Sequence, residues 1–539
     1  MNRTDIHLLD LPVEILLKIL KRLNNMDVLY SLIGVEGLDL LAQDDIFTNT
    51  LNFVLTDNGD YYSINEPILN RFCNDILPRI QYNVRSLYLE TTTMDHILRA
   101  GVYPNLTKLK IFKFHENFLL HFGTDELLFR YNFKKQITNL TLVSDYGGKV
   151  GTLDQTTNVF IKLLDFFENL NYLSCIGSSV TGNPVLSFVD LPLNTFVSSN
   201  LTKLCVTVDS FGDCLRLLDG RLNQLSTFIV IIINAKDYSS MEFNSNVLHH
   251  LKCFSLTYES LTNEYDNQVA PLLHRMCNLQ DLTLYIQIDK RNRLVDGIQL
   301  ENDILIHLSK LETFTFYICT CTSANHPVTL SNDDIQRTFS NVKFGQVGCS
   351  MNYVNESDIT YHVFSLPFKF DRIRFIGNSF TNTIFKDVTF LCVFDWIPFE
   401  HEFFVRLARC FPLLKTLIIV NCKAQSTDSA KSKHDNNGPF EVVQYLHLTS
   451  LEFGRTHIDY VEQMLNESKT RLPCLTQLWI DYHQLKTVTN NFTRDATRLN
   501  CINIEELDFH SGSDHDDSDD HLIIAQSKDF HVYFPLLKL

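Results

Sequence analysis

The sequence predicts an α/β fold in which a short helical segment at the N-terminus is followed by a long, curved repeat array. The parallel strands are expected on the concave face of the array and the helices on its convex face. One apolar pattern recurs through most of the 539 residues, and self-similarity at intervals of about 20 to 50 residues is typical of repeat proteins. The N-terminal residues break this pattern and carry helix signals instead.

The N-terminal segment, Leu8 to Ile33, predicts two helices. Pro12 suits a first helical turn, where its missing N–H costs nothing, and Val13 to Leu23 continues with good helix formers. Asn24 and Asn25 are expected to end this helix, and Asp27 is expected to cap a second one over Val28 to Ile33.

The two predicted helices carry much apolar surface for about 25 residues. So small a piece cannot bury all of it internally, because domains under about 40 residues seldom form a sufficient core. The surface must pack on something else. Either the first repeat of the same chain or a partner protein could cover it, and composition leaves both alternatives open.

The run from Leu9 to Leu32 resembles the first half of an F-box. The resemblance rests on residues of the expected kind at Leu11, Pro12, Glu14, Ile15, Ile19, Leu20, Leu23, Asp27 and Leu29. The second half departs from that family, since Gly34 to Gly37 and a stretch without Trp follow where the family commonly has a Cys/Arg-rich segment and a Trp.

The resemblance implies a subunit of an SCF-type ubiquitin ligase, whose F-box docks on a Skp-family adaptor within a cullin-RING ligase. It implies adaptor contacts for Leu11, Pro12, Ile15, Leu16, Ile19 and Leu20. It implies packing roles within the F-box for Leu23, Val28, Leu29 and Leu32. The expected organisation is an F-box-like helical domain at 1–47, a linker or solenoid entry at 48–83, and a repeat array at 84–539.

The recurring pattern is written L-x-x-L-x-L, with an apolar residue at each L. Its last two apolar positions alternate with period 2, as a short strand with one buried face requires. Most units start 22 to 35 residues apart, which leaves room for a strand, a turn and a return helix, the anatomy of a leucine-rich repeat. The middle apolar positions are Leu87, Leu109, Leu140, Leu204, Phe228, Phe254, Leu282, Phe314, Val342, Leu417, Leu451, Leu478 and Leu507.

The segments between the strands support this interpretation. Asn158 to Asn169 and Ile458 to Lys469 each place apolar residues on one helical face. Separate α/β domains are the alternative. Two further matches, centred on Ile373 and Val388, lie only 15 residues apart, so one is expected to be an irregular insertion or a chance match. The polar stretch Cys422 to Phe440 predicts a surface loop.

Composition excludes several classes of function. The net charge of −17 opposes binding to a phosphate backbone, so no nucleic-acid partner is expected. The longest apolar stretch, Phe228 to Ile233, is far shorter than the roughly 20 residues of a membrane span and predicts a buried strand. No secretory signal is seen, and the 14 cysteines are scattered. We therefore expect a cytoplasmic or nuclear protein, with no membrane partner.

Catalytic and metal-binding motifs are incomplete, and we expect no enzyme activity, metal or cofactor. His401-Glu402 begins like a zinc-protease motif, but Val405 stands where the second histidine ligand should be. The acidic stretch from Asp514 to Asp520 lacks the glycine and the closing glutamate of a calcium loop, which favours a solvated acidic loop.

A binding surface can be predicted from the repeat. The residue between the last two apolar positions points out of each strand, away from the core. Towards the C-terminus these positions hold Glu452, Trp479 and Asp508, an aromatic residue flanked by acids that suits a basic protein partner. Alternatively, a neighbouring loop or helix covers the Trp.

The predicted function is therefore that of a non-catalytic substrate receptor of an SCF-type ubiquitin ligase, which holds an unidentified target protein on its repeats. The alternative is a leucine-rich-repeat scaffold without a ligase role. In that case the N-terminal helices would only cap the array.

Overall fold

The computed structural model describes residues 11–57, 60–114, 131–144, 153–177, 185–192, 195–235, 246–323, 330–426, 441–509 and 528–537. These residues form a mixed α/β protein with mostly parallel sheets, as the sequence predicts. The chain divides into two compact units. The first comprises Met1–Ser260, Asn267–Leu282 and Leu308–Leu311, and the second comprises Leu261–Asp266, Thr283–His307 and Glu312–Leu539.

Four short helices open the first unit: α1 (Val13–Leu20), α2 (Asn25–Leu32), α3 (Asp39–Ala42) and α4 (Asp45–Thr48). Helix α1 ends three residues earlier than predicted. The prediction that Asp27 caps the second helix is wrong: Asn24 adopts the extended cap conformation, and its side chain accepts a hydrogen bond from the Met26 N–H at 2.9 Å. Asp27 lies inside the first turn of α2, where a carboxylate still favours the positive end of the helix dipole.

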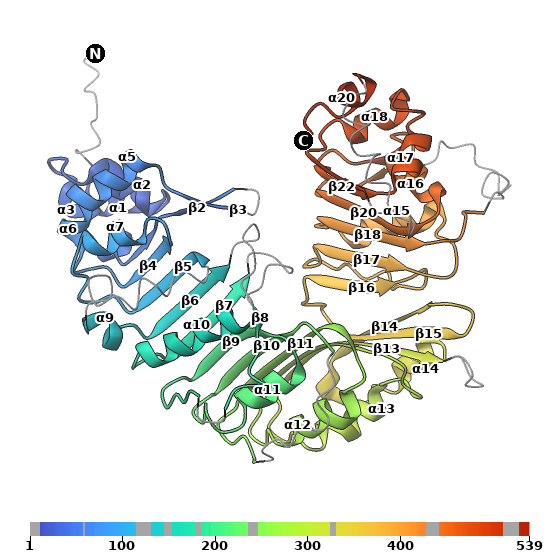
Figure 1. The fold of residues 1–539 in the computed structure, drawn as a ribbon, viewed down its shortest axis with the longest axis horizontal. Coiled ribbons are helices and arrows are strands. Elements are labelled where there is room, and N and C mark those ends of the chain that lie inside the picture. Colours follow the sequence, from blue (N-terminus) through green and yellow to red (C-terminus); the bar gives the residue numbers. More distant parts are fainter. Residues whose placement is uncertain are drawn as a thin grey trace. The chain divides into compact units, whose positions relative to one another are not determined.

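The strands of the first unit pair in parallel in nearly sequential order (Figure 1). They are β1 (Thr50–Asn52), β4 (Ser86–Glu90), β5 (Lys108–Phe114), β6 (Asn139–Ser144), β7 (Tyr172–Gly177), β9 (Lys203–Val208), β10 (Thr227–Ile232) and β11 (Cys253–Thr262), with β8 (Val185–Leu186) beside β9. The middle positions of the apolar pattern align from strand to strand and are all buried: Leu51, Leu87, Leu109, Leu140, Leu173, Leu204, Phe228 and Phe254.

Two of these strands were not predicted. Strand β1 lies inside the predicted linker at 48–83, because its pattern begins with Thr48 instead of an apolar residue. Strand β7 ends its pattern with Cys175. The Thr48 and Cys175 side chains are both buried. A threonine or a cysteine can therefore occupy a core position where the pattern usually has a larger apolar residue.

Helices lie along one side of this sheet (Figure 1). They include α9 (Tyr131–Gln136), α10 (Leu153–Phe166) and α11 (Phe211–Leu217), while α5 (Glu66–Arg71), α6 (Leu77–Ile80) and α7 (Met94–Arg99) connect the first strands. Helix α10 confirms the helix predicted at 158–169 but begins and ends earlier. The antiparallel hairpin of β2 (Val54–Asp57) and β3 (Asp60–Ser63) packs on the other side, where Val54 clusters with Phe112 and Val143.

Antiparallel pairing occurs in the second unit, after the strand β12 (Asp281–Ile288). Strand β15 (Asp358–Leu366) lies between β13 (Thr313–Ser323) and β14 (Gln346–Tyr353) and is antiparallel to both. The strand predicted around Val342 is wrong, because Val342–Phe344 forms a 3-10 turn. Apolar residues spaced by three and two fit a tight helical turn as well as a strand. Here the rings of Phe339 and Phe344 pack on Phe316.

A second parallel sheet follows, ordered β16 (Arg372–Ile376), β17 (Phe390–Phe394), β18 (Thr416–Asn421), β20 (Ser450–Thr456), β22 (Gln477–Ile480) and β23 (Glu506–Phe509). Both crowded pattern matches lie at strands, but the second match is out of register. Leu391, not Val388, pairs with Ile373, so the true pattern of β17 is Val388, Leu391 and Val393. The described connection between these two strands contains no helix, which explains their short spacing.

The second unit also contains the helices α13 (Gly297–Leu300), α14 (Asn332–Arg337), α15 (His401–Cys410), α16 (Ile458–Leu465), α17 (Tyr482–Val488), α18 (Asp495–Cys501) and α20 (Lys528–Tyr533) (Figure 1). Helix α16 confirms the helix predicted to begin at Ile458. Most of the predicted loop at 422–440 and the whole acidic stretch at 514–520 lie outside the described residues. The core of this unit is rich in phenylalanine and leucine, and its strands and helices share it.

Candidate functional site

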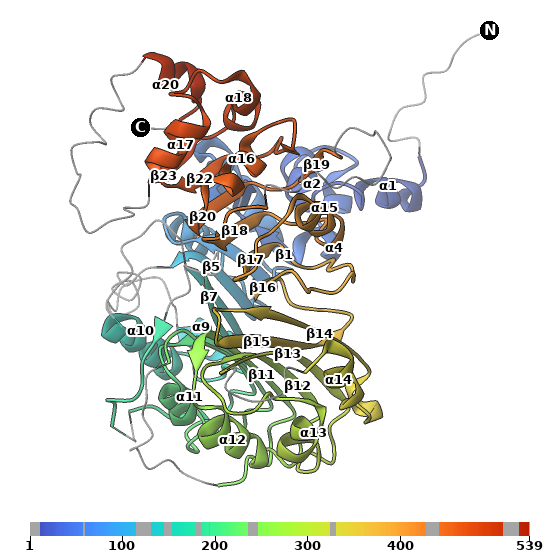
Figure 2. The ribbon, with the colours of Figure 1, turned by 90° about the vertical axis from the view of Figure 1, so that its right-hand side faces the viewer.

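Helix α1 has one buried face and one exposed face. Leu16 and Leu20 are 3% and 6% exposed, whereas Ile15, Ile19 and Leu23 are 40%, 42% and 56% exposed. Ile15 and Ile19 are four residues apart and lie on one side of α1, and Leu23 lies in the turn that follows the end of the helix at Leu20. These three exposed residues are called the apolar stripe. Pro12 is exposed and Leu11 partly exposed at its N-terminal end. Figure 2 shows α1 at the outer edge of the N-terminal helices.

The structure corrects three of the expected assignments at this segment. Leu16 and Leu20, which were expected to contact an adaptor, lie inside the segment. Leu23, which was expected to pack inside, lies outside. At about 100° per residue, the mean direction of Leu16 and Leu20 lies roughly 100° around the helix from that of Ile15 and Ile19. Val28 and Leu29 are buried as expected, and Leu32 is partly buried.

Helix α2 anchors the segment to the first strand and to α5 by specific contacts. The Asn25 side-chain amide donates to the carbonyls of Phe47 at 3.0 Å and Thr50 at 2.6 Å. The Arg71 guanidinium lies 4.4 Å from the centre of the Tyr30 ring. The segment is therefore fixed to the sheet on one side, and the apolar stripe of α1 is left without cover from the described residues.

A second candidate surface lies on the outward face of the second parallel sheet. Glu452, Trp479 and Asp508 are direct register partners on β20, β22 and β23. Leu451, Leu478 and Leu507 stand beside them in sequence and belong to the core, so alternation directs the three residues away from it. Trp479 and Glu452 are half-buried and Asp508 is exposed. The structure thus brings the predicted binding residues together in one row.

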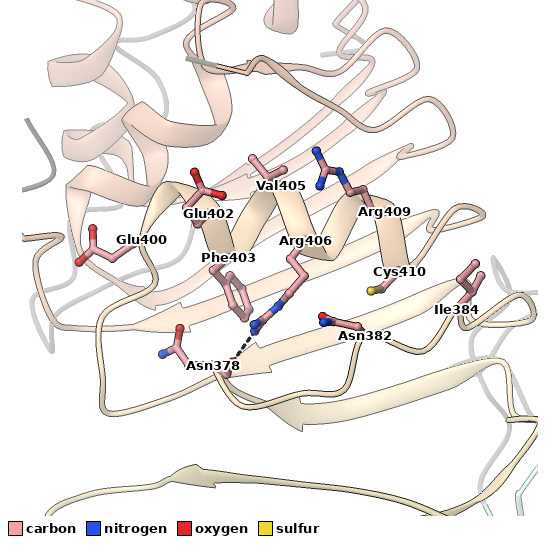
Figure 3. A pocket seen from close by; sticks show the side chains of 10 residues that line it. All are labelled: Asn378, Asn382, Ile384, Glu400, Glu402, Phe403, Val405, Arg406, Arg409 and Cys410. Atoms are coloured by element: carbon pink, nitrogen blue, oxygen red, sulfur yellow. Dashed lines mark hydrogen bonds between the residues drawn. The ribbon is translucent and has the colours of Figure 1, made fainter. Parts of the chain in front are cut away.

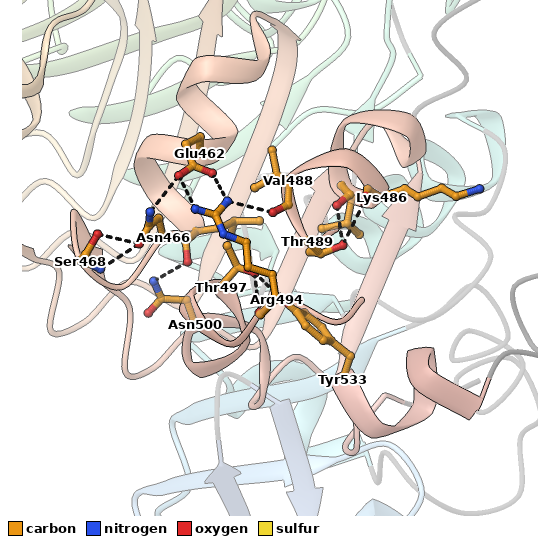
Figure 4. Close-up of polar contacts among 12 residues, drawn as sticks. Glu462, Asn466, Ser468, Lys486, Val488, Thr489, Arg494, Thr497, Asn500 and Tyr533 are labelled. Atoms are coloured by element: carbon orange, nitrogen blue, oxygen red, sulfur yellow. Dashed lines mark hydrogen bonds and ion pairs between the residues drawn. The ribbon is translucent and has the colours of Figure 1, made fainter. Parts of the chain in front are cut away.

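The helices behind this row are tied together by a polar network (Figure 4). Arg494 donates to both carboxylate oxygens of Glu462 on α16, at 2.5 and 2.9 Å, and to the carbonyl of Val488 on α17 at 3.1 Å. The Asn500 amide on α18 donates to the carbonyls of Leu465 and Thr470. These bonds fix α16, α17 and α18 relative to one another and so hold the strands between them in register.

A cleft of about 650 Å³ opens between α15 and the loop that follows β16 (Figure 3). Both arginines that line it already have partners. Arg406 donates to the carbonyl of Asn378 and lies 4.3 Å from the Phe380 ring centre, and Arg409 pairs with Glu441 at 2.7 Å. Burial raises the pKa of the Cys410 thiol, which disfavours the thiolate. This cleft could not be predicted from the sequence, because only Glu402 and Val405 among its lining residues belong to a motif, and that motif is incomplete.

A cluster of buried polar side chains in the same unit connects three strands. The Tyr317 hydroxyl lies 2.9 Å from His362 Nδ1, and His362 Nε2 lies 2.7 Å from the Asn352 amide oxygen. Burial lowers the pKa of His362 to about 3, so the ring is neutral at pH 7. The cluster holds β13, β14 and β15 together and is enclosed, without a path to a substrate.

The incomplete zinc-protease motif lies at the start of α15. His401 Nε2 lies 2.9 Å from the Glu441 carbonyl, its Nδ1 lies 3.2 Å from the Gln463 side chain, and Val405 is buried. Among the described residues, no three His, Cys, Asp or Glu side chains are arranged to hold a metal ion. All 14 cysteines are free, and none of the described helices is long and apolar enough to cross a membrane.

Comparison with known proteins identifies no relative. No protein-family model matches the chain, and no curated protein matches it. The two surfaces described above therefore carry the functional argument: the apolar stripe of α1 and the row formed by Glu452, Trp479 and Asp508.

Proposed function

We propose that this chain is a non-catalytic substrate receptor of an SCF-type ubiquitin ligase. In this proposal residues 1–47 act as an F-box that docks on a Skp-family adaptor in the cytoplasm or nucleus, and a leucine-rich-repeat array holds a target protein. The observation that carries the proposal is the stripe of Ile15, Ile19 and Leu23, which stays exposed although the other face of the same helix is packed. Exposed apolar stripes of this kind favour helix-in-groove or helix-on-helix recognition.

The parallel register supports the repeat-array part of the proposal. One strand per repeat, with the same apolar position aligned from β1 to β11 and again from β16 to β23, is the expected arrangement of a leucine-rich-repeat solenoid. Positioning a target near the ligase requires binding surfaces and no chemistry, because a high local concentration of the target is sufficient.

A scaffold without a ligase role is the rival function. Its support is that Leu16, Leu20, Val28 and Leu29 are buried within the chain itself, as the residues of a capping segment would be. The rival does not require the opposite face of α1 to stay apolar. The two functions therefore differ in what they predict for the stripe.

The receptor and scaffold functions can be distinguished by measuring whether the purified full-length chain binds a purified Skp-family adaptor. Ile15→Asp with Ile19→Asp places two charges in the stripe and leaves the buried face intact. We expect this variant to weaken adaptor binding at least tenfold, the loss that corresponds to about 1.4 kcal/mol. Val13→Asp is the matched control, because Val13 is 50% exposed and points roughly 160° away from Ile15. If the wild-type chain binds no adaptor, or the double variant binds as well as wild type, the proposal fails.

A further inference from the structure

The outward face of the first unit's sheet carries two lysines on one strand. Lys108 and Lys110 lie on β5, on either side of Leu109, which is buried in the core. Alternation along the strand therefore directs both lysines away from the core and the helices. Lys108 is exposed and Lys110 is half-buried. Because a strand rises about 3.3 Å per residue, their Cα atoms lie roughly 6.6 Å apart, and two positive charges stand close together on this face.

Aromatic rings surround the ammonium of Lys110. It lies 5.6 Å from the centre of the Tyr88 ring and 4.7 Å from the centre of the Phe112 ring. Phe112 clusters with Val54 of the β2–β3 hairpin, and Tyr88 packs against this cluster. These apolar groups displace water from the ammonium, and burial lowers the pKa of Lys110. A partly desolvated cation is attracted more strongly by an added carboxylate than a fully hydrated cation is.

Neither lysine has a carboxylate partner among the residues that the structure describes. Glu90 lies two residues beyond Tyr88 on β4 and points to the same face of the sheet. It is 4% exposed and forms an ion pair with Lys113 at 3.2 Å. The charge of Glu90 is therefore already matched, and the charges of Lys108 and Lys110 are left for a ligand.

The surface around the lysine pair contains no acidic residue. Each strand contributes two outward positions, directly before and after its aligned apolar residue, and these positions form two rows across the sheet. From β1 to β11 the two rows hold no aspartate or glutamate, and they add one further lysine, Lys203 on β9. The first carboxylate along the rows is that of Asp281 on β12, six strand spacings from β5. In a chain of net charge −17, this face is locally positive.

We propose that Lys108 and Lys110 bind two acidic side chains at alternate positions of an extended segment in the target protein, laid along β5. Side chains two residues apart in an extended segment point the same way and have the spacing of the two lysines. Charge complementarity of this kind favours recognition of one partner over others. A nucleic-acid strand fits less well, because the net negative charge of the chain repels a phosphate backbone. The inference rests on the proposed function for the existence of a target, and it names the chemistry of that target.

Protection of lysines from acetylation in the full-length chain, read by mass spectrometry, tests the site. The probe is an N-acetylated, C-amidated Gly-Ser peptide with four glutamates at alternate positions, and the control peptide has glutamines in their place. Both are used at millimolar concentration and equal ionic strength. We expect the glutamate peptide to slow acetylation of Lys108 and Lys110 at least threefold. Lys134 and Lys135 are the reference and should react at an unchanged rate, because they lie on α9, on the helix side of the sheet, and pair with Glu168.

Variants then locate the binding energy. Lys108→Gln with Lys110→Gln should weaken binding of the glutamate peptide at least fivefold, measured by anisotropy of an uncharged dye on the peptide. Lys134→Gln with Lys135→Gln removes the same charge from the same unit and should change binding less than twofold. Both variants should keep the unfolding temperature of wild type, since all four side chains are at least partly exposed.

Three results would overturn the proposal. They are equal protection of the pair by the glutamate and glutamine peptides, equal weakening by the two variants, and protection by a single-stranded oligothymidylate of the same charge that matches the glutamate peptide. The protection experiment uses the wild-type chain, so it stays decisive even if a variant folds poorly. Adaptor binding through α1 is measured on the same preparations. Loss of the adaptor interaction and loss of the acidic-segment interaction are thereby scored separately.

Discussion

The two faces of α1 predict that truncating a buried side chain destabilises the protein much more than truncating the exposed side chain next to it. Leu16 is 3% exposed, and removing a buried leucine side chain to Ala costs about 2–5 kcal/mol because of lost transfer free energy and the cavity left behind. Ile15 is 40% exposed, so about three fifths of its side chain is buried. Full burial of the three methylene-sized groups that Ala lacks stabilises a protein by roughly 2.4 kcal/mol, and the truncation loses about three fifths of this free energy. Solvent fills the space that Ile15 leaves, and Ala is the better helix former. Ile15→Ala should therefore cost only about 1 kcal/mol.

Native-state hydrogen exchange of the α1 and α2 amides is the suitable assay. It reports local opening free energies, whereas a chain of two units need not unfold in one transition. Leu16→Ala should raise exchange of these amides by at least tenfold relative to Ile15→Ala, and Leu20→Ala should do so relative to Ile19→Ala. Equal exchange in either pair would refute the assignment of buried and exposed faces.

Three further predictions concern the second unit and its thiols. Glu462→Gln should destabilise the second unit by about 1–3 kcal/mol at pH 7, because it removes the charged acceptor of Arg494. Burial raises the pKa of the Glu462 carboxyl, but the hydrogen bonds from Arg494 and Asn466 outweigh this effect and lower it below its ordinary value of 4.5. The stabilisation is therefore present above pH 4.5 and lost as the pH falls through the lowered pKa, so denaturant unfolding at pH 7 and pH 3 should show a gap between wild type and variant that closes in acid. Burial lowers the pKa of His362 from 6.5 to about 3, so below pH 6.5 the unfolded chain binds a proton at this residue and the folded chain does not. The free energy of unfolding of wild type should therefore fall between pH 6.5 and pH 3 more steeply than that of His362→Gln. Parallel pH profiles of the two proteins would contradict the buried neutral ring. Alkylation of the native protein with iodoacetamide, followed by mass spectrometry, should modify the exposed Cys422 and Cys474 first and leave the fully buried Cys319 and Cys501 unmodified; early modification of Cys501 would contradict its burial.

Most parallel strands could be predicted because period-2 alternation and the apolar residue ahead of it are local properties of the sequence. Strands β1 and β7 were not predicted, because Thr48 and Cys175 occupy apolar positions of the pattern. Either side chain can be buried beside a sheet. The antiparallel β14 and β15 could not be predicted from a repeat. The pattern around Val342 was misread because a 3-10 turn satisfies the same spacing.

The candidate surfaces were predictable to different degrees. Register follows from the pattern, so the row of Glu452, Trp479 and Asp508 could be placed from sequence once each strand was identified. The exposed face of α1 could not, because all sides of that helix are rich in apolar residues. Which of them is buried depends on where the first strand lies, and the contacts that fix this join residues 22 and 25 positions apart in sequence, Asn25 with Phe47 and Asn25 with Thr50.

The stripe of α1 as a docking surface is the central claim, and site-specific photo-crosslinking tests it most directly. A photoreactive amino acid replaces Ile19 in one full-length preparation and Val13 in another, and each is irradiated with the purified Skp-family adaptor. We predict that the probe at position 19 crosslinks to the adaptor and that the probe at position 13, on the other side of the helix, does not. Absence of a crosslink from position 19, or equal crosslinking from both positions, would contradict the claim.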